Sequence, residues 1–421
     1  MENCRWRSFK LLCFLLLLFL QACSTNTSAS SGFITLTVYA KHQGDPAKVL
    51  QDIAQKFVQE NPNIKVNFSA PGSKYEEILK VKMTSNDMPD VFATHGWAKR
   101  RYGPFLADLR DQPWVSRLSP TIKDIVTDQS GKVYVLPIDQ DKRGFVYNID
   151  ILNQYGISVP TTYDEFLAAC QTIKEKSHEQ VIPIHLGGAD IGPIAQFFNT
   201  FSTPQLISPS QNYRAALLDG TFDWSNYTPL AEKLLQLQQL GYLNRDVLST
   251  TYTDSVKAFA EGKAAFAWYA TGEITDARKI NPNLRGGLMP TPSIVKGDVP
   301  TFAVGERLTW GVWKDSPHLE AAKKFVTFYA RPENIARVAQ SDLLSPGLNG
   351  VNVSLGDVGF YFQKYSQTPV FPFFDRVYLP SGMFQVLDKN GRELLAGAIT
   401  PSQFSDNTRD EYNRLRVSDA S

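Results

Sequence analysis

Four short segments of the chain bring charged side chains and aromatic rings together within a few residues. They contain His95 and Trp97; Asp139 and Asp141; Trp268 and Tyr269; and Glu306, Arg307 and Trp310. A hydrogen bond to an ionised carboxylate is about twice as strong as one between neutral groups, and an aromatic ring offers a flat apolar face. We therefore expect these segments to bind a ligand that presents both hydroxyl groups and an apolar surface.

Catalysis is the alternative chemistry for the same residues. Asp139 and Asp141 could serve as the acid and the base of a secreted glycoside hydrolase. Side chains two residues apart on an extended segment face the same way, however, so this spacing is not by itself evidence of catalysis. The sequence therefore favours a binding site over an active site.

The sequence shows no metal-binding or phosphate-binding pattern. The five histidines, at positions 42, 95, 178, 185 and 318, have no His-x-x-x-His spacing. Gly187 and Gly188 lack the rest of a phosphate-binding loop, and the segment 219–223 has too few oxygen ligands for a calcium loop. We therefore expect no metal and no cofactor.

The N-terminal segment has the pattern of an export signal. Three basic residues precede an apolar run at 11–20, which is shorter than the roughly 20 residues that a membrane-spanning helix needs. The sequence Leu-Gln-Ala-Cys at 20–23 and the polar tract after it resemble the signal of bacterial lipoproteins. This resemblance implies removal of residues 1–22, a lipid on Cys23 and a tether over 23–32, outside the cytoplasm at the cell membrane. An ordinary signal peptide with an incidental cysteine is the alternative.

The chain that remains is close to neutral. Residues 1–22 carry three basic side chains and one acidic side chain, so their loss changes the formal net charge from +1 to −1. This balance does not favour nucleic acid or an acidic membrane surface as a partner. Cys4 and Cys13 leave with the signal peptide, and Cys170 is then expected to be a buried thiol without a disulfide.

Strands and helices are expected to alternate after the tether. Residues 33–40 alternate as a strand, 45–58 carry an apolar stripe at helical spacing, and 64–68 return as a strand. A helix at 73–85 and a buried strand at 90–93 follow. The alternation predicts a parallel sheet with helices on both faces, and the length of the chain predicts two lobes rather than one.

The parallel sheet predicts where a ligand would lie. Ligands of such sheets bind outside the carboxyl ends of the strands. Lys41 and His42 follow the first expected strand, and His95 and Trp97 follow the third. We therefore expect these four side chains at the same edge of the sheet, facing a ligand.

Seven segments, in this order along the chain, resemble the extracellular solute-binding family 1, which contains maltose-binding protein and other sugar-binding lipoproteins. The segments are 53–62 (IAQKFVQENP), 86–91 (NDMPDV), 131–137 (GKVYVLP), 147–148 (YN), 156–166 (GISVPTTYDEF), 259–266 (FAEGKAAF) and 316–325 (SPHLEAAKKF). Each segment alone is a weak signal, because most of these residues serve packing. Their order and spacing extend over nearly the whole mature chain, and this makes the joint signal strong.

The resemblance implies an α/β fold of the periplasmic-binding-protein type II class, with two lobes, a hinge and a central ligand cleft. We place the first lobe at 33–138 and 286–331, and the second at 139–285 and 332–421. The expected function is that of a monomer that captures a carbohydrate, most simply an oligosaccharide, by lobe closure. It would deliver this ligand to the membrane subunits of an ABC importer and would not be an enzyme. The alternatives are a phosphorylated or other anionic solute and a sensory role for the same fold.

The resemblance also assigns roles to the candidate residues. In maltose-binding protein, a carboxylate that binds sugar hydroxyls lies seven residues before the asparagine that matches Asn148, and the same count gives Asp141 here. Asp139 would be a hinge residue or a second ligand group. Trp97 would stack on the sugar, with a place in the core of the first lobe as its alternative.

The remaining aromatic and charged candidates lie later in the chain. Trp268 or Tyr269 would supply a second stacking face. Glu306 and Arg307, beside Trp310, would either bind the ligand or form a buried ion pair. Phe374 represents an aromatic and charged segment, in which Phe371, Phe373, Asp375 and Arg376 are the other members, and the family often places a further sugar contact there.

Overall fold

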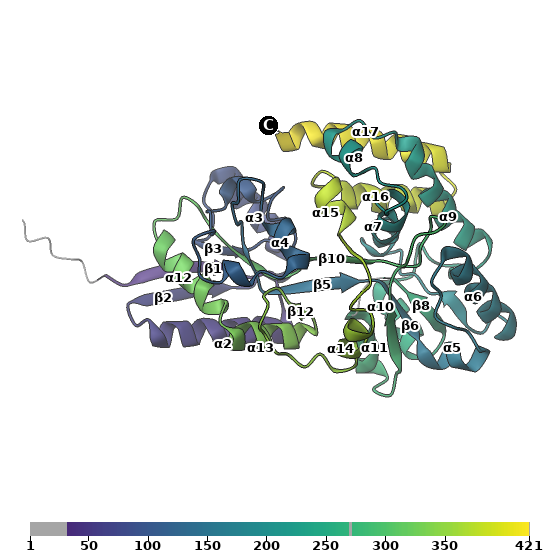
Figure 1. Cartoon of the computed structure of the whole chain (residues 1–421), viewed down its shortest axis with the longest axis horizontal. Coiled ribbons are helices and arrows are strands. Elements are labelled where there is room, and N and C mark those ends of the chain that lie inside the picture. Colours follow the sequence, from purple (N-terminus) through teal and green to yellow (C-terminus); the bar gives the residue numbers. More distant parts are fainter. Residues whose placement is uncertain (1–31, 269–271, 421) are drawn as a thin grey trace, which may run out of the picture.

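The computed structural model describes residues 32–268 and 272–420, which form two α/β lobes (Figure 1). The sheet of the first lobe has the strand order β2 (Ile64–Ser69), β1 (Ile34–Tyr39), β3 (Val91–Ala93), β11 (Thr309–Val312) and β4 (Leu136–Pro137). Strand β1 pairs in parallel with β2 and β3, whereas β11 runs antiparallel to β3 and β4. The carboxyl ends of β1 and β3 therefore lie at one edge of the sheet, as predicted.

Helices cover this sheet because their apolar stripes match its faces. The helices of the first lobe are α2 (Gly44–Glu60), α3 (Tyr75–Ser85), α4 (Pro120–Val126), α12 (Leu319–Tyr329) and α13 (Pro332–Asp342). The stripe of α2 buries Leu50, Ile53 and Phe57 completely. The Phe57 ring packs edge-to-face on Phe325 and Phe328 of α12, with centroid distances of 5.1 and 5.4 Å. Aromatic contacts of this kind join distant segments into one core.

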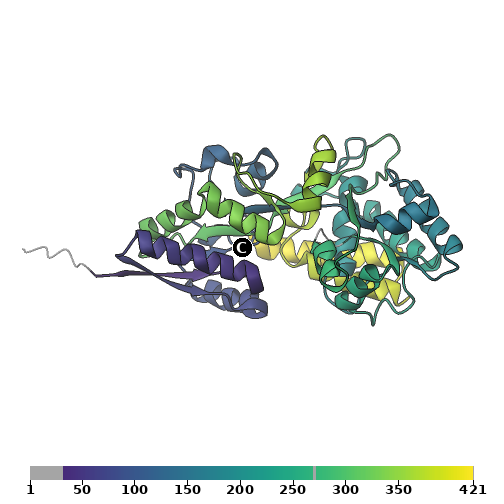
Figure 2. The same ribbon diagram turned by 90° about the horizontal axis from the view of Figure 1, so that it is seen from below.

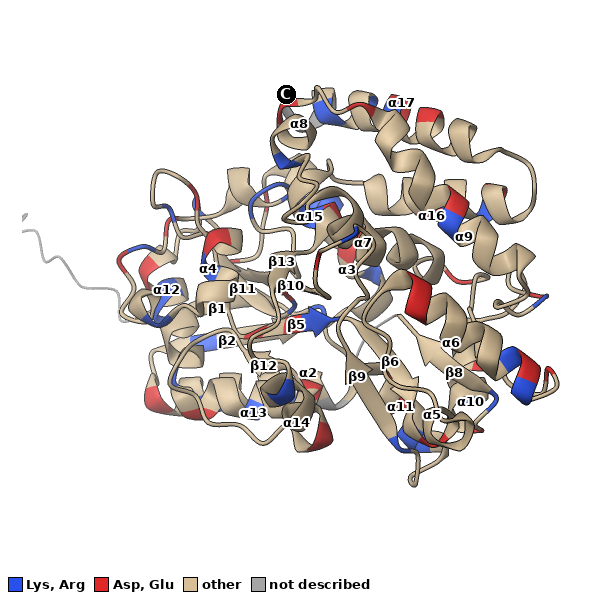
Figure 3. Cartoon of the chain, turned by 45° about the vertical axis from the view of Figure 1, so that its right-hand side comes forward, with Lys and Arg blue, Asp and Glu red and all other residues tan. Residues whose placement is uncertain are grey.

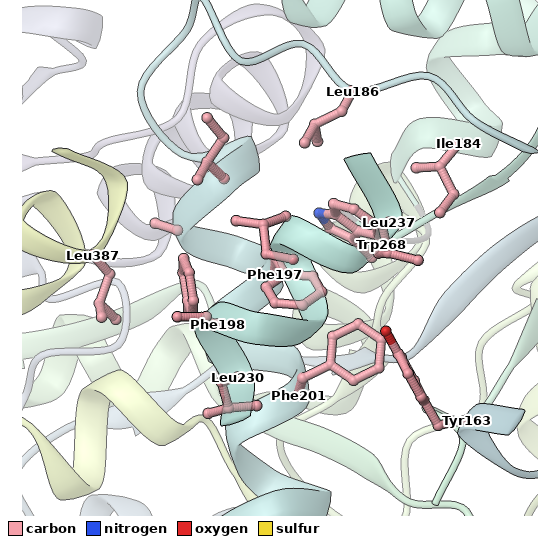
Figure 4. Close-up of a cluster of buried hydrophobic side chains, with 14 of the residues drawn as sticks. Tyr163, Ile184, Leu186, Phe197, Phe198, Phe201, Leu230, Leu237, Trp268 and Leu387 are labelled. Carbon is pink, nitrogen blue, oxygen red and sulfur yellow. The ribbon is translucent and has the colours of Figure 1, made fainter. Parts of the chain in front are cut away.

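The second lobe has its own sheet and its own core. Its strand order is β7 (Ile182–Ile184), β8 (Ala264–Ala267), β6 (Phe145–Asn148) and β9 (Gly286–Met289). Its helices are α5 (Ile149–Tyr155), α6 (Tyr163–Lys176), α7 (Pro193–Leu206), α8 (Arg214–Asp219), α9 (Thr228–Gln239), α10 (Tyr252–Ala260), α11 (Gly272–Ile280), α14 (Gly356–Lys364), α15 (Phe374–Tyr378), α16 (Met383–Leu395) and α17 (Pro401–Ala420). Helix α7 lies at the centre of the core, where Phe197 and Phe201 pack beside Trp268 (Figure 4).

A helix start in the second lobe shows how local sequence sets an element. The Thr162 hydroxyl accepts a hydrogen bond from the backbone N–H of Glu165, and the Glu165 side chain accepts one from the backbone N–H of Thr162. This capping box satisfies amide groups that have no partner inside the helix. It fixes the start of α6, which continues to Lys176.

A third sheet connects the lobes (Figures 1 and 2). Its strand order is β12 (Ser345–Pro346), β5 (Asp139–Arg143), β10 (Phe302–Glu306) and β13 (Val370–Pro372). Strands β5 and β10 are antiparallel, with Asp141 opposite Gly305, and they carry the chain between the lobes in opposite directions. Residues on these two strands are therefore within reach of both lobes.

Two of the predicted lobe boundaries need correction. Strand β9 begins at Gly286, which we had placed in the first lobe, but it pairs with β6 in the sheet of the second lobe. Helix α13 follows the predicted boundary at residue 331, yet its Ile335 and Val338 lie in the core of the first lobe. An amphipathic pattern predicts a helix but does not tell which of two cores receives its apolar face.

The core around α7 allows a test of the fold. Replacing Phe197 by alanine should lower the free energy of unfolding by about 3–5 kcal/mol, because this fully buried ring leaves a cavity among Phe198, Phe201 and Trp268. Chemical denaturation measures this loss. Phe360→Ala is the matched control, since its ring is 61% exposed, and it should change stability by no more than about 0.5 kcal/mol. Equal losses in the two variants would contradict the assigned core.

Candidate functional site

Charged side chains gather at the carboxyl edge of the first sheet. Lys41 follows β1, His95 follows β3, and Glu76 lies in the first turn of α3. Arg101 and Tyr102 lie on the loop that continues from His95. We call these five residues the first-lobe cluster.

The Glu76 carboxylate is the centre of the first-lobe cluster. Its Oε1 atom is 3.1 Å from Lys41 Nζ and 2.7 Å from His95 Nε2. Its Oε2 atom is 3.0 Å from Arg101 Nη1 and accepts a hydrogen bond from the Tyr102 hydroxyl at 3.3 Å. One carboxylate thus orients four surrounding side chains.

The electrostatics fix the form of His95. Burial lowers the pKa of His95 to about 4, against the opposing effect of Glu76, so the imidazole is neutral at pH 7. Burial raises the pKa of Glu76, but the hydrogen bond with His95 and the charges of Lys41 and Arg101 prevail and hold this pKa well below its usual range. The geometry then assigns the proton to Nε2, which donates to Glu76, while Nδ1 lies 3.3 Å from Lys41 Nζ and accepts from it.

The backbone that carries His95 is held in an uncommon conformation. His95 has φ +37° and Gly96 has φ +98°. A side chain other than hydrogen at Gly96 would meet the guanidinium of Arg376, whose Nη1 lies 2.2 Å from the position of an added Cβ. A non-glycine residue with positive φ is uncommon, and here this backbone conformation lets the first lobe approach an arginine of the second.

A second group of side chains, most of them charged, lies where the lobes meet. It comprises Asp141, Arg143, Glu306, Phe373, Asp375 and Arg376, which we call the interlobe cluster. The strands β5 and β10, together with the start of α15, bring these residues to the middle of the molecule, between the lobes (Figures 1 and 3).

The two arginines of the interlobe cluster flank one aromatic ring. The guanidinium carbons of Arg143 and Arg376 lie 4.6 and 4.5 Å from the centroid of Phe373. Arg143 also pairs with Asp141 at 2.6 Å and donates to the Gln196 side chain at 2.7 Å. Arg376 donates to the backbone carbonyl of Glu306 at 2.6 Å. Cation–π contacts are strongest where water is excluded, so this ring helps to hold both charges in place.

The interlobe cluster leaves three buried carboxylate oxygens without a donor. Asp141 Oδ1, Glu306 Oε2 and Asp375 Oδ1 accept no hydrogen bond from the described residues, and all three side chains are almost fully buried. Burial raises the pKa of Glu306 to about 7, although the charge of Arg376 lowers it, and burial likewise raises the pKa of Asp375. An unsatisfied buried acceptor costs about 1–3 kcal/mol, so these oxygens are suited to donors from outside the protein.

Direct hydrogen bonds join the two lobes beside this cluster. Arg100 donates to the backbone carbonyls of Val377 and Leu379, at 2.5 and 3.2 Å. Arg101 donates from Nε to the hydroxyl of Ser381 at 3.1 Å. Because Arg101 also pairs with Glu76, the first-lobe cluster is linked to the turn that precedes α16 in the second lobe.

The second lobe contributes a small cavity of about 20 Å³ at the carboxyl ends of β7 and β8. Its walls include His185, Ser255, Trp268 and Glu273, and His185 Nδ1 lies 3.2 Å from the Ser255 hydroxyl. A space of this size holds about one water molecule. The cavity therefore marks polar groups of the second lobe, not the position of a large ligand.

Some predicted site residues lie in these clusters and others do not. The structure brings Lys41 and His95 together in the first-lobe cluster, and Asp141 and Glu306 together in the interlobe cluster. Trp97 is 9% exposed and lies in the core of the first lobe, with Arg101 covering its ring at 4.6 Å. Its surroundings therefore match the alternative that we gave for it.

Three aromatic candidates need correction. Trp310 is fully buried in the core of the first lobe, against Phe325 and Tyr329. Phe374 is fully buried in the core of the second lobe. Trp268 is 2% exposed and donates from Nε1 to the carbonyl of Pro193 at 3.0 Å. Their rings pack the two cores and are not open stacking faces.

The other candidates lie elsewhere. A separate group at the junction of the lobes contains His42, Asp139 and Arg307. These three residues are not part of the first-lobe cluster. Tyr269 and Cys23 lie outside the described residues. Cys170 is a buried free thiol, as expected.

Between residues 32 and 420, with 269–271 set aside, no group of acidic, histidine or cysteine side chains has the arrangement of a metal site. In the same part of the chain, no helix is long and apolar enough to cross a membrane.

The sequence analysis missed Glu76, Arg101, Arg143 and Asp375 as site residues. Glu76 follows β2, so the rule that selects residues after parallel strands could have found it. Asp375 and its neighbour Arg376 lay in a segment that we had identified, but there we chose Phe374. No sequence signal separated the buried ring from the charged residues beside it.

The close contact at Gly96 gives a prediction. Gly96→Ala should lower the free energy of unfolding by about 1 kcal/mol more than Gly262→Ala does. Both glycines have positive φ, +98° and +72°, but an added Cβ at Gly262 meets no atom within 4 Å, whereas at Gly96 it displaces Arg376. Thermal or chemical unfolding of the two variants isolates the contact. Equal destabilisation of the two variants would show that the Arg376 side chain does not need the space that Gly96 leaves for it.

Comparison with known proteins gives the relatives of the chain. Residues 41–336 match the family described as bacterial extracellular solute-binding protein. The chain is 40% identical over 415 residues to the melibiose/raffinose/stachyose-binding protein MelE of Bacillus subtilis (strain 168), with 97% of this chain and 96% of that protein covered. It is 22% identical over 423 residues to the sn-glycerol-3-phosphate-binding periplasmic protein UgpB of Salmonella typhimurium, with 92% and 94% covered.

Solved structures agree with this relationship. A binding protein of Bacillus subtilis in an open conformation superposes with a TM-score of 0.87 at 40% identity, over 93% of this chain and 100% of that chain. A sugar transporter protein of Bacillus licheniformis in complex with stachyose superposes with a TM-score of 0.81 at 43% identity, over 91% and 100%. The two lobes around a shared set of charges, together with these matches, show that the chain belongs to the bacterial extracellular solute-binding protein family, whose members bind solutes and are not enzymes.

Proposed function

We propose that the protein binds a galactose-containing oligosaccharide of the raffinose type between its lobes, at the interlobe cluster. The observation that carries this proposal is the set of three buried carboxylate oxygens, on Asp141, Glu306 and Asp375, that accept no hydrogen bond from the described residues. Hydroxyl groups of a sugar are donors that such oxygens need. The relative MelE is named for melibiose, raffinose and stachyose, and the protein of Bacillus licheniformis was solved with stachyose.

The charges of the site favour a neutral ligand over an anionic one. An anion would lie among three carboxyl groups, and the two nearby guanidinium groups already have acceptors, on Asp141 and on the Glu306 backbone. Bringing like charges together in a buried site is unfavourable. The alternative of a phosphorylated solute, which the relationship to UgpB keeps open, therefore has less support from these residues.

The proposed binding uses both clusters. Sugar hydroxyls would donate to the carboxylates of the interlobe cluster, and Lys41, whose side chain is 42% exposed, would donate to ring or hydroxyl oxygens of the ligand. The aromatic rings of Phe373 and Trp97 each lie beside an arginine of these clusters. Lobe closure would then remove water from the polar groups and strengthen their hydrogen bonds.

The anchor and the importer complete the proposal. The tract 20–23 supports lipid attachment at Cys23, which would hold the protein outside the cytoplasm at the cell membrane. A monomer with two movable lobes suits the delivery of a captured sugar to the membrane subunits of an ABC importer. Labelling of Cys23 by a lipid precursor in cells, lost in Cys23→Ser, tests the anchor.

Calorimetry with raffinose tests the ligand. Raffinose and stachyose should bind, whereas maltose and sn-glycerol 3-phosphate should not. Asp141→Asn should weaken raffinose binding at least about tenfold, or about 1.4 kcal/mol, because a charged acceptor becomes a neutral one. Asp357→Asn, at an exposed acidic residue of α14, is the matched control and should bind like the wild type.

Two results would contradict this account. Binding of sn-glycerol 3-phosphate without binding of any galactoside would replace the sugar by an anion. Binding of raffinose with equal affinity in Asp141→Asn and Asp357→Asn would place the sugar away from the interlobe cluster.

A further inference from the structure

Helix α7 is unusual for a core helix, because it carries a polar stripe. Every residue of this helix is buried, and a helix that is buried on all sides is normally hydrophobic on all sides. The rings of Phe197 and Phe201 fit this expectation, since they lie in the apolar core of the second lobe (Figure 4). The polar stripe has the i, i+3, i+4, i+7 spacing of one helix face and consists of Gln196, Asn199, Thr200 and Thr203. Buried polar side chains need partners, and two of these residues find theirs at the interlobe cluster.

Gln196 connects the polar stripe to Arg143 of the interlobe cluster. Its side chain is 1% exposed, and its Oε1 atom accepts a hydrogen bond from Arg143 Nη1 at 2.7 Å. Its Nε2 atom donates to the Thr200 hydroxyl at 2.9 Å. A guanidinium group has only donors, so it must face the carbonyl oxygen of the amide. The hydrogen bond to Thr200 at the other end of the amide keeps this oxygen turned toward Arg143.

The Arg143 guanidinium is held on three sides. Its Nε atom donates to Asp141 Oδ2 at 2.6 Å, its Nη1 atom donates to Gln196, and its face lies on Phe373. Asp141 therefore has Oδ2 in the ion pair, while Oδ1 accepts no hydrogen bond from the described residues. An arginine can also bind a carboxylate through two parallel hydrogen bonds. A guanidinium that Gln196 did not hold could turn to take both oxygens of Asp141, and the open acceptor would be lost.

Asn199 supports a second carboxylate of the interlobe cluster through the backbone. It lies three residues after Gln196 on the same face of α7, and its side chain is 2% exposed. Its Oδ1 atom accepts a hydrogen bond from the backbone N–H of Asp375 at 3.0 Å. The N–H groups in the first turn of a helix have no partner inside that helix, so Asn199 fixes the start of α15. One face of one helix thus supports both Asp141 and Asp375.

We propose that Gln196 is a positioning residue of the ligand site, which holds Arg143 on Oδ2 of Asp141 so that Oδ1 stays open to a hydroxyl group of the ligand. Its effect on affinity rests on the proposed function, whereas its hold on Arg143 does not. Gln196 acts on the ligand only through Arg143 and Asp141. Because α7 lies at the centre of the second core, the packing of that core sets the direction in which the site presents its acceptor.

A double-mutant cycle with raffinose tests the role of Gln196. Methionine is close in length to glutamine but offers no strong acceptor, so Gln196→Met should weaken raffinose binding at least about threefold. In the Asp141→Asn background, the same substitution should change the affinity by less than about 1.5-fold, because the carboxylate on which Gln196 acts is no longer present. Calorimetry measures all four affinities.

Gln205→Met is the matched control for this cycle. It is the same substitution on the same helix, nine residues or about 13 Å further along its axis. The Gln205 Oε1 atom accepts no hydrogen bond from the part of the chain that the structure describes, so this variant should bind raffinose like the wild type. Equal losses of affinity from Gln196→Met with and without Asp141→Asn would overturn the proposal, because a merely structural effect does not depend on Asp141. If Gln196→Met does not fold, Thr200→Val makes the same comparison, since it removes the hydroxyl that orients the Gln196 amide.

Unfolding of the ligand-free protein separates this proposal from the proposed function. Gln196 and Asp141 bind the same guanidinium group. The loss of stability in the double variant should therefore differ from the sum of the losses in Gln196→Met and Asp141→Asn. Additive losses would overturn the hold of Gln196 on Asp141 through Arg143. If the wild type fails to bind raffinose, the proposed function is wrong, and the unfolding cycle still decides whether Gln196 positions Asp141.

Discussion

Charged groups that are buried between two lobes must have partners, and this requirement connects the features of this protein. Taking an ion out of water costs several kcal/mol, which only well-placed opposite charges and hydrogen bonds recover. The interlobe cluster meets this demand partly, through the Arg143–Asp141 pair and the contacts of Arg376 with Glu306 and Phe373. The three carboxylate oxygens that accept no hydrogen bond from residues 32–268 and 272–420 show where this demand is not met. A ligand rich in hydroxyl groups would complete the set.

The division into two cores makes such a site possible. Each lobe buries its own apolar residues, so the lobes can move relative to each other without opening either core. Polar contacts join them, and these include the hydrogen bonds from Arg100 to the backbone carbonyls of Val377 and Leu379. Polar contacts of this kind exchange readily with water, whereas a shared apolar core would resist opening. The arrangement of two separate cores joined by polar contacts therefore suits solute capture by closure.

The elements and the edge that carries the site followed from the sequence, because these depend on short-range patterns. The alternation of strands and helices predicted β1, β2, β3 and the helices between them. The rule for parallel strands then placed Lys41 and His95 together.

The direction of individual aromatic side chains did not follow. Phe374 stands next to Asp375, and Trp310 lies four residues after Glu306, but residues close in sequence can point to different sides, and these two rings face the cores. Arg101 was missed for a related reason. Its importance comes from meeting Glu76 across 25 residues of chain, and a single sequence does not record such a meeting.

Small-angle X-ray scattering of the full mature protein, without and with saturating stachyose, tests the central claim most directly. The account predicts that the radius of gyration falls when stachyose binds, because hydroxyl groups between the lobes draw the first-lobe and interlobe clusters together. An unchanged radius of gyration in a protein that calorimetry shows to be saturated with stachyose would contradict binding by lobe closure.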